Sequence, residues 1–500
     1  MAEAVRQWIG RHAGWVALAL GAAMPLAFAP FGLWWLSPLL VAGLFLLWDG
    51  SPPREAARLG LVFGFGHFLA GTYWITVSIH VFGELPLALA VVLMLLVVVI
   101  MAAYFALLGG LSARLAPAPG PLRWLLLLPA AWVLVEWLRG WLFTGFGWLA
   151  LGYAQTDSAL AGLAPVLGVY GVSLAVALSA GALCCLLAGR RRPARLAGAA
   201  VLLLVWGVSA GLGRVGWTTP QAEGLRVALV QANVSQELKW APEQFAATLE
   251  LYEALTVAAL DHDLVVWPEA AIPALVHEVA GYLEHVRELA DEAGSAVMLG
   301  ILRYDFRDRR YENTLLALGD TPQFYVKRHL VPFGEYFPVP AQVRDWLRLM
   351  SLPYTDISAG GDGQAPLRLA GQVFAPSICY EALFGASQLV FQPEATLLVN
   401  VSNDAWFGDS IAPHQHLQIA RLRSLETGRW MLRATNTGIS ALIDPAGRVV
   451  QRSPQFETYV LSGQVVGHEG STPYAMLGNR AIVLLAILML LAGALATRRG

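Results

Sequence analysis

The segment "QVFAPSICYE" (residues 372–381) decides the fold of the second half of this 500-residue chain. It is mostly apolar, as in a strand buried on both faces, and it ends on a cysteine, a tyrosine and a glutamate. Strand-like segments of this kind occupy 225–234, 263–272, 295–302, 323–332, 372–381 and 395–404, and helical periodicity occupies 242–260, 276–294 and 414–428. Strands that alternate with helices predict an α/β layered domain over residues 216–470.

Three of the predicted strands end on side chains that carry chemistry, namely Glu269, Lys327 and Cys379. Layered α/β folds gather their ligands at strand ends, so these residues are candidates for one site. Each also has a structural interpretation. Cys379 fits a small buried apolar residue, Glu269 fits a helix N-terminus after a proline, and Lys327 fits a solvated strand residue.

Lysine usage favours the functional interpretation of Lys327. The chain has two lysines, Lys239 and Lys327, so 31 of its 33 basic Lys and Arg residues are arginines. A retained lysine indicates a place that needs a compact ammonium, for example opposite a developing oxyanion. Cys379 needs a base, and Glu269 is the candidate, with its pKa expected to be raised by a dry pocket between Trp267 and Pro268.

The composition predicts a membrane protein, because 57% of the residues are hydrophobic and 14% are charged, against about 25% charged in a soluble protein. Apolar segments long enough to cross a bilayer predict a membrane α-helical domain with eight spans. They lie at 13–29, 33–49, 59–80, 85–112, 122–144, 160–189, 196–213 and 479–496. We therefore expect seven transmembrane helices in residues 1–215 and a C-terminal transmembrane helix in 471–500. A cleaved signal peptide is the alternative for the first span.

The loop arginines predict the orientation of these spans. Arginines gather before the first span, between the second and third, fourth and fifth, and sixth and seventh spans, and after the eighth. The other loops carry no Lys or Arg, so both termini are expected in the cytoplasm and residues 216–470 in the bacterial periplasm. A net charge of −2 argues against nucleic acid as a partner.

The order Glu269, Lys327, Cys379 resembles the Glu-Lys-Cys triad of the nitrilase superfamily, which implies an α-β-β-α sandwich. Longer motifs resemble the bacterial apolipoprotein N-acyltransferases, in which such a catalytic domain is fused to a membrane domain. They are "EWLRGWLFTGFGWLALGYAQ" (136–155), "QANVSQELKW" (231–240), "FGEYFP" (333–338), "CYEALF" (379–384) and "SNDAWFGDS" (402–410).

This resemblance implies an acyltransferase of the bacterial inner membrane. The thiolate of Cys379 would take an acyl chain from the sn-1 position of a phospholipid, usually phosphatidylethanolamine, and pass it to the α-amine of a diacylglyceryl-cysteine apolipoprotein. No cofactor and no metal is implied. Lys327, and the backbone N–H of Tyr380, would stabilise the oxyanion. The resemblance also marks Trp240, Glu335, Tyr380, Glu381 and Trp406, with Glu335 and Glu381 expected to position Lys327 or to assist as acids and bases.

Several alternatives stay open from the residues alone. A membrane-bound amidase of the nitrilase type, acting on a small periplasmic amide, would use the same triad, and a transporter would not need it. The aromatic loops 333–354 and 405–410 either dip into lipid or cap the core. The arginines of 421–433 bind a phosphate headgroup or form ion pairs, and Glu136 and Arg139 have the same two interpretations.

Overall fold

The computed structural model describes residues 11–116, 118–237, 239–336 and 357–499. The chain divides into two compact units. Unit 1 comprises Met1–Gly216, Phe407–Glu426 and Thr472–Gly500, and unit 2 comprises Trp217–Trp406 and Thr427–Ser471. Residues 407–426 thus belong to unit 1, although the segments on either side of them belong to unit 2.

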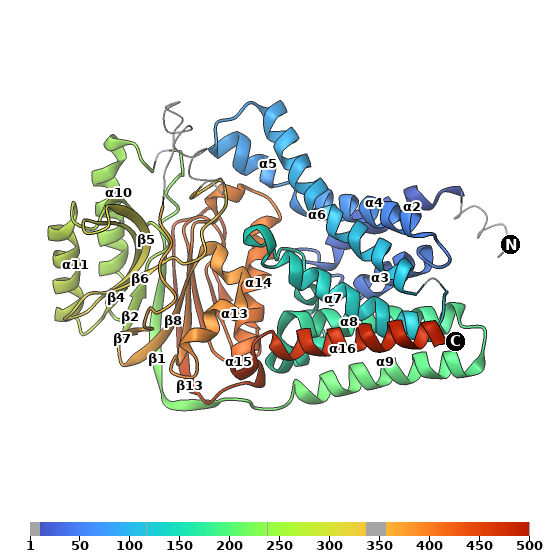
Figure 1. Ribbon diagram of the computed structural model, residues 1–500. Helices are drawn as coiled ribbons and strands as arrows, with labels where there is room; N and C mark the ends of the chain where they lie inside the picture. The colour runs from blue at the N-terminus through green and yellow to red at the C-terminus, as the bar shows by residue number, and fades with distance from the viewer. Residues whose placement is uncertain (1–10, 117, 238, 337–356, 500) are drawn as a thin grey trace. The chain divides into compact units, whose positions relative to one another are not determined.

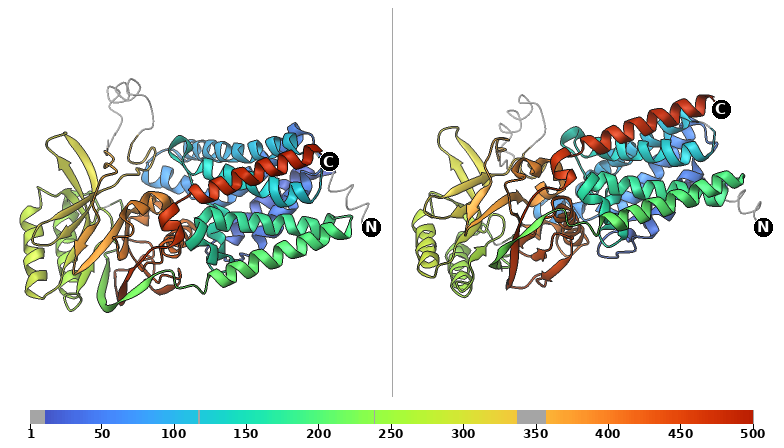
Figure 2. Two further views of the ribbon diagram at one scale, coloured as in Figure 1. Left: turned by 60° about the horizontal axis from the view of Figure 1, so that its bottom comes forward. Right: turned by 90° about the horizontal axis from the view of Figure 1, so that it is seen from below.

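Unit 1 is helical (Figures 1 and 2). Its helices are α2 (Ala13–Ala23), α3 (Leu36–Leu47), α4 (Pro53–Thr72), α5 (Ile75–Val77), α6 (Leu87–Leu115), α7 (Leu128–Arg139), α8 (Ala164–Ala188), α9 (Arg192–Leu212), α14 (Ala412–Thr427), α15 (Pro473–Leu477) and α16 (Arg480–Arg499). Figure 2 shows α9 (green) and α16 (red) running along the same bundle.

Small residues set how closely these helices approach. A Cβ atom on Gly60 of α4 would lie 2.2 Å from the carbonyl oxygen of Phe105, and one on Gly109 of α6 would lie 2.3 Å from that of Ala56. Helices α4 and α6 therefore pack backbone to backbone, which is the usual arrangement between helices that share a membrane.

The helix lengths support a membrane domain. Among the described residues, three helices are long and apolar enough to cross a bilayer, at Leu87–Leu115, Ala159–Ala188 and Arg192–Leu212. Pro53–Thr72 and Ile75–Phe82 form a fourth candidate as a pair bent by 59°. Shorter apolar helices occupy Ala13–Ala27, Leu36–Leu47 and Arg480–Ala496. Several apolar helices are thus present, and among the described residues three or four of them pass a test of length and composition, so the expected count of eight spans is not confirmed.

Unit 2 is the expected layered α/β domain, with two mixed sheets. Its strands are β1 (Thr219–Gln231), β2 (Leu264–Val266), β3 (Ile272–Leu275), β4 (Val297–Asp305), β5 (Arg310–Leu318), β6 (Gln323–Val326), β7 (Leu367–Leu369), β8 (Gln372–Ile378), β9 (Leu397–Ser402), β10 (Met431–Thr435), β11 (Ala441–Ile443), β12 (Val449–Arg452) and β13 (Tyr459–Glu469). One sheet has the order β13-β1-β2-β4-β5-β6, with β3 beside β4, and the other has the order β12-β11-β10-β9-β8-β7.

Helices α10 (Pro242–Val257) and α11 (Ala280–Glu292) cover one face of the first sheet (Figure 1). The apolar core between them includes Tyr252 of α10, Val286 of α11 and Trp267, whose ring lies 4.7 Å from that of Tyr252. The opposite face meets the second sheet, where Gln231 Oε1 accepts a hydrogen bond from the Ser440 hydroxyl at 2.8 Å. A helix layer and two stacked sheets therefore hold the strand ends that carry the candidate residues.

Two expectations about the elements need correction. Residues 263–272 were expected to form one strand, but β2 spans only Leu264–Val266. Pro268 has no N–H to donate, and Ala270 has a φ of 45°, so the chain turns directly after β2. Strand β5 was not predicted, because its polar first half, "RYENT" (310–314), hides its strand character.

Helix α14 was expected to be part of the layered domain, but its residues up to Glu426 belong to unit 1. Gln415 accepts a hydrogen bond from Nε1 of Trp148 at 2.7 Å, and Glu426 accepts one from the backbone N–H of Val169 at 2.8 Å. The polar side chains of α14 thus bond inside the helical unit, which periodicity alone does not reveal.

Candidate functional site

Cys379 lies where β8 ends and a 3₁₀ helix, Cys379–Leu383, begins. Its φ of 51° places it in the left-handed region, which is unusual for a residue with a Cβ atom. Such backbone strain occurs where surrounding contacts hold a side chain in a required direction. Cys379 is 9% exposed as a whole residue, so it is buried.

Glu269 lies in the turn after β2, and both of its carboxylate oxygens accept hydrogen bonds. Oε1 accepts from Asn313 Nδ2 at 2.8 Å and from Lys327 Nζ at 3.1 Å, and Oε2 accepts from the backbone N–H of Asn403 at 2.9 Å. Gly300 of β4 makes room for this turn, since a Cβ atom there would lie 2.6 Å from the Cα atom of Glu269. The carboxylate is therefore fixed in one orientation.

Lys327 directly follows β6 and is 1% exposed. Its Nζ atom donates to Glu269 Oε1 at 3.1 Å and to Glu335 Oε1 at 2.9 Å, while Glu335 Oε2 accepts from the backbone N–H of Val331 at 2.8 Å. Glu335 thus positions the ammonium, as the sequence resemblance implied.

Asn313 on β5 completes this arrangement, and the sequence did not single it out. Its Nδ2 atom donates to Glu269 Oε1 at 2.8 Å and to Glu335 Oε1 at 3.0 Å, so it bridges the two carboxylates. Its backbone carbonyl accepts from the backbone N–H of Lys327 at 2.8 Å. The signal that could have found it is a polar residue directly before the apolar run "TLLAL" (314–318).

The charges act on each other within this buried cluster. Burial alone would raise the pKa of Glu269, but the Lys327 charge and the hydrogen bonds from Asn313, Lys327 and Asn403 hold that pKa below its usual value of 4.5. Burial tends to lower the pKa of Lys327, yet Glu269 and Glu335 raise it well above the usual value. The expected rise in the pKa of Glu269 is thus wrong, because three donors outweigh the dry pocket.

The thiol behaves differently from these two groups. Burial, followed by the negative charge of Glu269, raises the pKa of Cys379 above its ordinary value of 9.0, and Lys327 opposes this shift. The structure therefore brings Glu269, Lys327 and Cys379 into one electrostatic cluster that holds a protonated thiol, an ionised carboxylate and a charged ammonium. This set contains a nucleophile, a proton acceptor and a cation for an oxyanion.

Glu381 is buried and bonds mainly to backbone rather than to the ammonium of Lys327. Its carboxylate accepts from the N–H groups of Ile378 at 2.7 Å, Arg328 at 2.7 Å and His329 at 3.1 Å, and from the Tyr325 hydroxyl at 2.8 Å. It thereby ties the chain before Cys379 to the chain after Lys327. The expectation that Glu381 positions Lys327 or assists as an acid or base stays a prediction, since these hydrogen bonds of its carboxylate go to backbone N–H groups and to the Tyr325 hydroxyl.

The remaining marked residues are aromatic. The ring of Tyr380 lies 5.2 Å from that of Phe384 and 5.9 Å from that of His329. Trp240 is 52% exposed and Trp406 is 41% exposed. The loop residues marked for lipid contact at 337–354 lie outside the described residues.

Phe407, in the second aromatic loop, packs in unit 1, with its ring 4.8 Å from that of Trp74. The core-capping interpretation concerned the layered domain, so this contact in the helical unit does not confirm it.

The arginines and acids of the other clusters form structural contacts. Arg423 pairs with Glu426 at 3.0 Å, and Arg433 pairs with Asp404 at 2.8 Å, so the ion-pair interpretation of 421–433 is confirmed at these positions. In unit 1, Glu136 accepts from the backbone N–H of Leu151 at 2.9 Å.

Arg139 donates to the carbonyl oxygens of Phe146 at 2.5 Å and Trp148 at 2.6 Å. Glu136 and Arg139 thus hold the backbone of 146–151.

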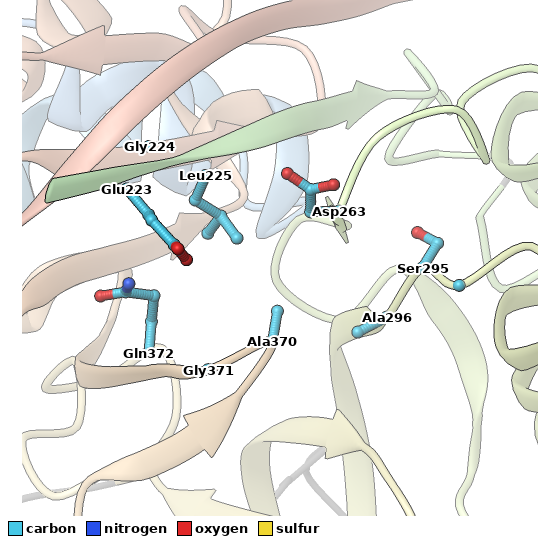
Figure 3. A pocket seen from close by; sticks show the side chains of 10 residues that line it. Glu223, Gly224, Leu225, Asp263, Ser295, Ala296, Ala370, Gly371 and Gln372 are labelled. Carbon is cyan, nitrogen blue, oxygen red and sulfur yellow. The ribbon is translucent and has the colours of Figure 1, made fainter.

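A pocket of about 470 Å³ lies elsewhere in unit 2 (Figure 3). It is lined by Glu223, Gly224, Leu225, Asp263, Gly294, Ser295, Ala296, Ala370, Gly371 and Gln372. Asp263 precedes β2, whereas Glu269 follows it. The pocket therefore lies at the opposite end of this strand from the cluster of Glu269, Lys327 and Cys379. Asp263 is itself paired with Arg226 at 2.6 Å.

Comparison with known proteins matches two families to successive parts of the chain. Residues 20–182 match the family described as apolipoprotein N-acyltransferase N-terminal domain, and residues 226–474 match the carbon-nitrogen hydrolase family. The apolipoprotein N-acyltransferase of Methylococcus capsulatus is 44% identical over 467 residues, which cover 93% of this chain and 92% of that protein. The enzyme of that name from Pseudomonas putida is 43% identical over 492 residues, 97% of each chain.

Among solved structures, a CN-hydrolase superfamily protein from Xanthomonas campestris matches 53% of this chain and 97% of its own, with 20% identity and a TM-score of 0.36.

Proposed function

The chain belongs to the apolipoprotein N-acyltransferase family, and from this premise we propose that it transfers a fatty acyl chain from a phospholipid to an apolipoprotein. The acyl chain leaves the sn-1 position of the phospholipid, preferably phosphatidylethanolamine. It is received by the N-terminal α-amine of a diacylglyceryl-cysteine, and this step completes lipoprotein maturation. One observation carries the proposal: a buried cysteine at a strand end shares an electrostatic cluster with the Lys327–Glu269 pair.

In the first half-reaction, Cys379 is acylated. Because the resting thiol is protonated and Glu269 is ionised, the proton passes to Glu269 as the sulfur attacks the ester carbonyl. Lys327 stabilises the negative oxygen of the tetrahedral intermediate, together with the backbone N–H of Tyr380. The glycerol oxygen then takes the proton from Glu269 and leaves as a lysophospholipid, and the acyl chain remains as a thioester.

In the second half-reaction, the α-amine of the apolipoprotein attacks the thioester. Glu269 accepts a proton from the attacking nitrogen, Lys327 again faces the oxyanion, and the sulfur leaves and regains the proton. The product is an amide, which is more stable than the thioester, so the transfer proceeds toward the lipoprotein. Trp240 and Trp406 are exposed indoles that we assign to substrate contacts, since such rings bind at lipid surfaces.

We also propose the bacterial inner membrane as the location, with both termini in the cytoplasm. Residues 1–215 and 471–500 form the eight-span membrane domain, and 216–470 form the periplasmic catalytic domain. Apolar side chains on the outer faces of the helices support this, for example Leu203 and Leu204 of α9 and Leu488 of α16, all of which are exposed. The arginines of alternate loops support the orientation.

The test is the intact mass of the full chain in detergent after incubation with phospholipid alone. A fatty-acyl adduct on the wild type that is absent from Cys379→Ala is expected. A diacylated lipopeptide with a free α-amine is then added and should remove the adduct as an amide.

Two results would contradict the proposal. If the wild type stays unmodified in an active preparation, the thioester intermediate is ruled out. Release of the acyl chain mainly as free fatty acid identifies a hydrolase, the amidase-type alternative.

A further inference from the structure

Both lysines of the chain are buried beside the same carboxylate. Lys239 is 2% exposed and Lys327 is 1% exposed. The negative charge of Glu269 acts on both ammonium groups. Lys327 has its counterions in Glu269 and Glu335. The mechanism does not use Lys239.

Lys239 has no such counterion. It forms no hydrogen bond or ion pair with any residue in the described part of the chain, and burial lowers its pKa to about 8. Lys239 thus stays mainly protonated at neutral pH. An unpaired buried ammonium is costly, on the order of several kcal/mol. Methionine would fill a similar volume without that cost, so the charge itself has a use.

The segment that carries Lys239 is anchored to the catalytic cluster. Gln236 Oε1 accepts from Asn403 Nδ2 at 2.7 Å, and the backbone N–H of Asn403 donates to Glu269. Two residues before Gln236, the backbone N–H of Val234 donates to Asn436 Oδ1 at 3.0 Å, and Asn436 Nδ2 donates to the Val234 carbonyl at 2.8 Å. The segment is therefore anchored at Val234 and Gln236, and the negative charge of Glu269 acts on Lys239.

We propose that Lys239 binds the phosphate of the phospholipid acyl donor. This inference rests on the proposed function, because that function supplies the anion. The modified cysteine of the acceptor brings an amine, a thioether and neutral esters. The phosphodiester of the donor is therefore the anionic group that the reacting parts of the two substrates bring to this site. A compact ammonium suits a phosphate oxygen as a point charge. Anchoring the headgroup there orients the sn-1 ester toward Cys379.

A simpler role for Lys239 is charge balance. Glu269 and Glu335 share the single positive charge of Lys327, and a second ammonium offsets the remaining negative charge. Charge balance affects the reaction of Cys379 with every acyl donor equally. Phosphate binding affects only donors that carry phosphate, and this difference separates the two roles.

The experiment compares two donors with the same acyl chain, a phospholipid and a neutral p-nitrophenyl ester. The rate of acyl-Cys379 formation is measured by intact mass for wild type, Lys239→Met and Lys239→Arg. Arg226→Met is the matched control, because Arg226 is an exposed cation in the same unit, with 60% side-chain exposure. Lys239→Met is expected to lower the phospholipid rate about 10- to 100-fold, and to leave the nitrophenyl ester rate unchanged. Lys239→Arg should retain part of the phospholipid rate.

Each alternative result is decisive. Equal loss with both donors assigns Lys239 to charge balance, and no loss with either donor removes it from the reaction; both results overturn the phosphate site. If phospholipid does not acylate the wild type, both the proposed function and the phosphate site are ruled out.

A competition arm separates the headgroup from free phosphate. Glycerophosphoethanolamine should slow acylation of the wild type by phospholipid, and inorganic phosphate should do so less. Equal inhibition by both would mark a site for free phosphate and overturn the assignment to the lipid donor.

Discussion

The Nδ2 atom of Asn313 lies 2.8 Å from Oε1 of Glu269 and 3.0 Å from Oε1 of Glu335. One amide group therefore holds two carboxylates against a single ammonium, that of Lys327. Without this donor the two Oε1 atoms would have only Lys327 Nζ as a common donor. A residue that does no chemistry itself thus helps the Lys327 charge to lower the pKa of the proposed base.

Replacing Asn313 by Asp tests this relationship. The change exchanges a donor for a third carboxylate, so it should raise the pKa of Glu269 and lower the rate of Cys379 acylation about 100-fold. Asn313→Ala removes the donor without adding charge and should cost about 10-fold. Acyl-enzyme formation measured by intact mass gives both values. Equal rates for the two variants would contradict the electrostatic role of Asn313.

The pH dependence gives a separate measurement. Glu269 acts in its ionised form, so activity falls as the pH falls through its pKa, which lies below 4.5 in the folded protein. Asn313→Ala removes one of the causes that lower this pKa, so the acidic limb of the activity profile should move to higher pH. A limb that stays in place, or moves to lower pH, would show that Asn313 does not act through Glu269.

Lys327→Arg should lose most of the activity although it keeps the charge. The ammonium is 1% exposed and fits between Glu269 and Glu335, and a planar guanidinium is larger and bonds along fixed directions. We expect the acylation rate to fall about 100-fold, as for the loss of an oxyanion donor. Steady-state transfer measures this, with Arg226→Lys as the surface control. Near-normal turnover would contradict the need for a lysine.

Glu381→Ala should lower stability more than Glu335→Ala does. Glu381 accepts from three backbone N–H groups and a hydroxyl, whereas Glu335 is partly exposed and accepts from one backbone N–H group. Removing a buried charged partner costs about 3 kcal/mol, so the Tm of the full chain in detergent should drop by several degrees. A larger drop for Glu335→Ala would show that the clamp is not structural.

The sequence could place Glu269, Lys327 and Cys379 near one another, because each lies within three residues of the end of an apolar strand. It could not place Asn313, because β5 begins with a polar run that hides the strand, and only strand pairing turns that side chain toward Glu269. Nor could it tell that Glu381, two residues beyond Cys379, bonds mainly to backbone. Spacing along the chain does not fix which way a side chain points after a tight turn.

The membrane domain shows the same limit. Apolar runs predicted where the helices lie, but among the described residues only three or four helices are long and apolar enough to cross a bilayer, so the count of eight spans is not confirmed. Helix α14 carries helical periodicity between two strands, so sequence order places it in the layered domain, while its bonds to Trp148 and Val169 belong to the helical unit. Contacts between segments far apart in the chain decide which unit such a helix belongs to.

The thiol of Cys379 should react slowly with iodoacetamide at neutral pH. Burial and the negative charge of Glu269 raise its pKa, so the rate should keep rising as the pH passes 9.0, the ordinary value. Intact mass followed by peptide mapping separates Cys379 from Cys184 and Cys185, and Cys379→Ala is the control. A rate that levels off below pH 9.0 would contradict the raised pKa.

Glu269→Gln provides the sharper form of this test. Removing the negative charge leaves Lys327 to attract the thiolate, so the pKa of Cys379 should fall and alkylation at a fixed pH should become faster. The same variant should lose acyl transfer, because the proton acceptor is gone. Faster alkylation together with lost transfer separates the reactivity of the sulfur from catalysis. Slower alkylation would mean that Glu269 activates the resting thiol, and proton transfer would then precede substrate binding rather than accompany attack.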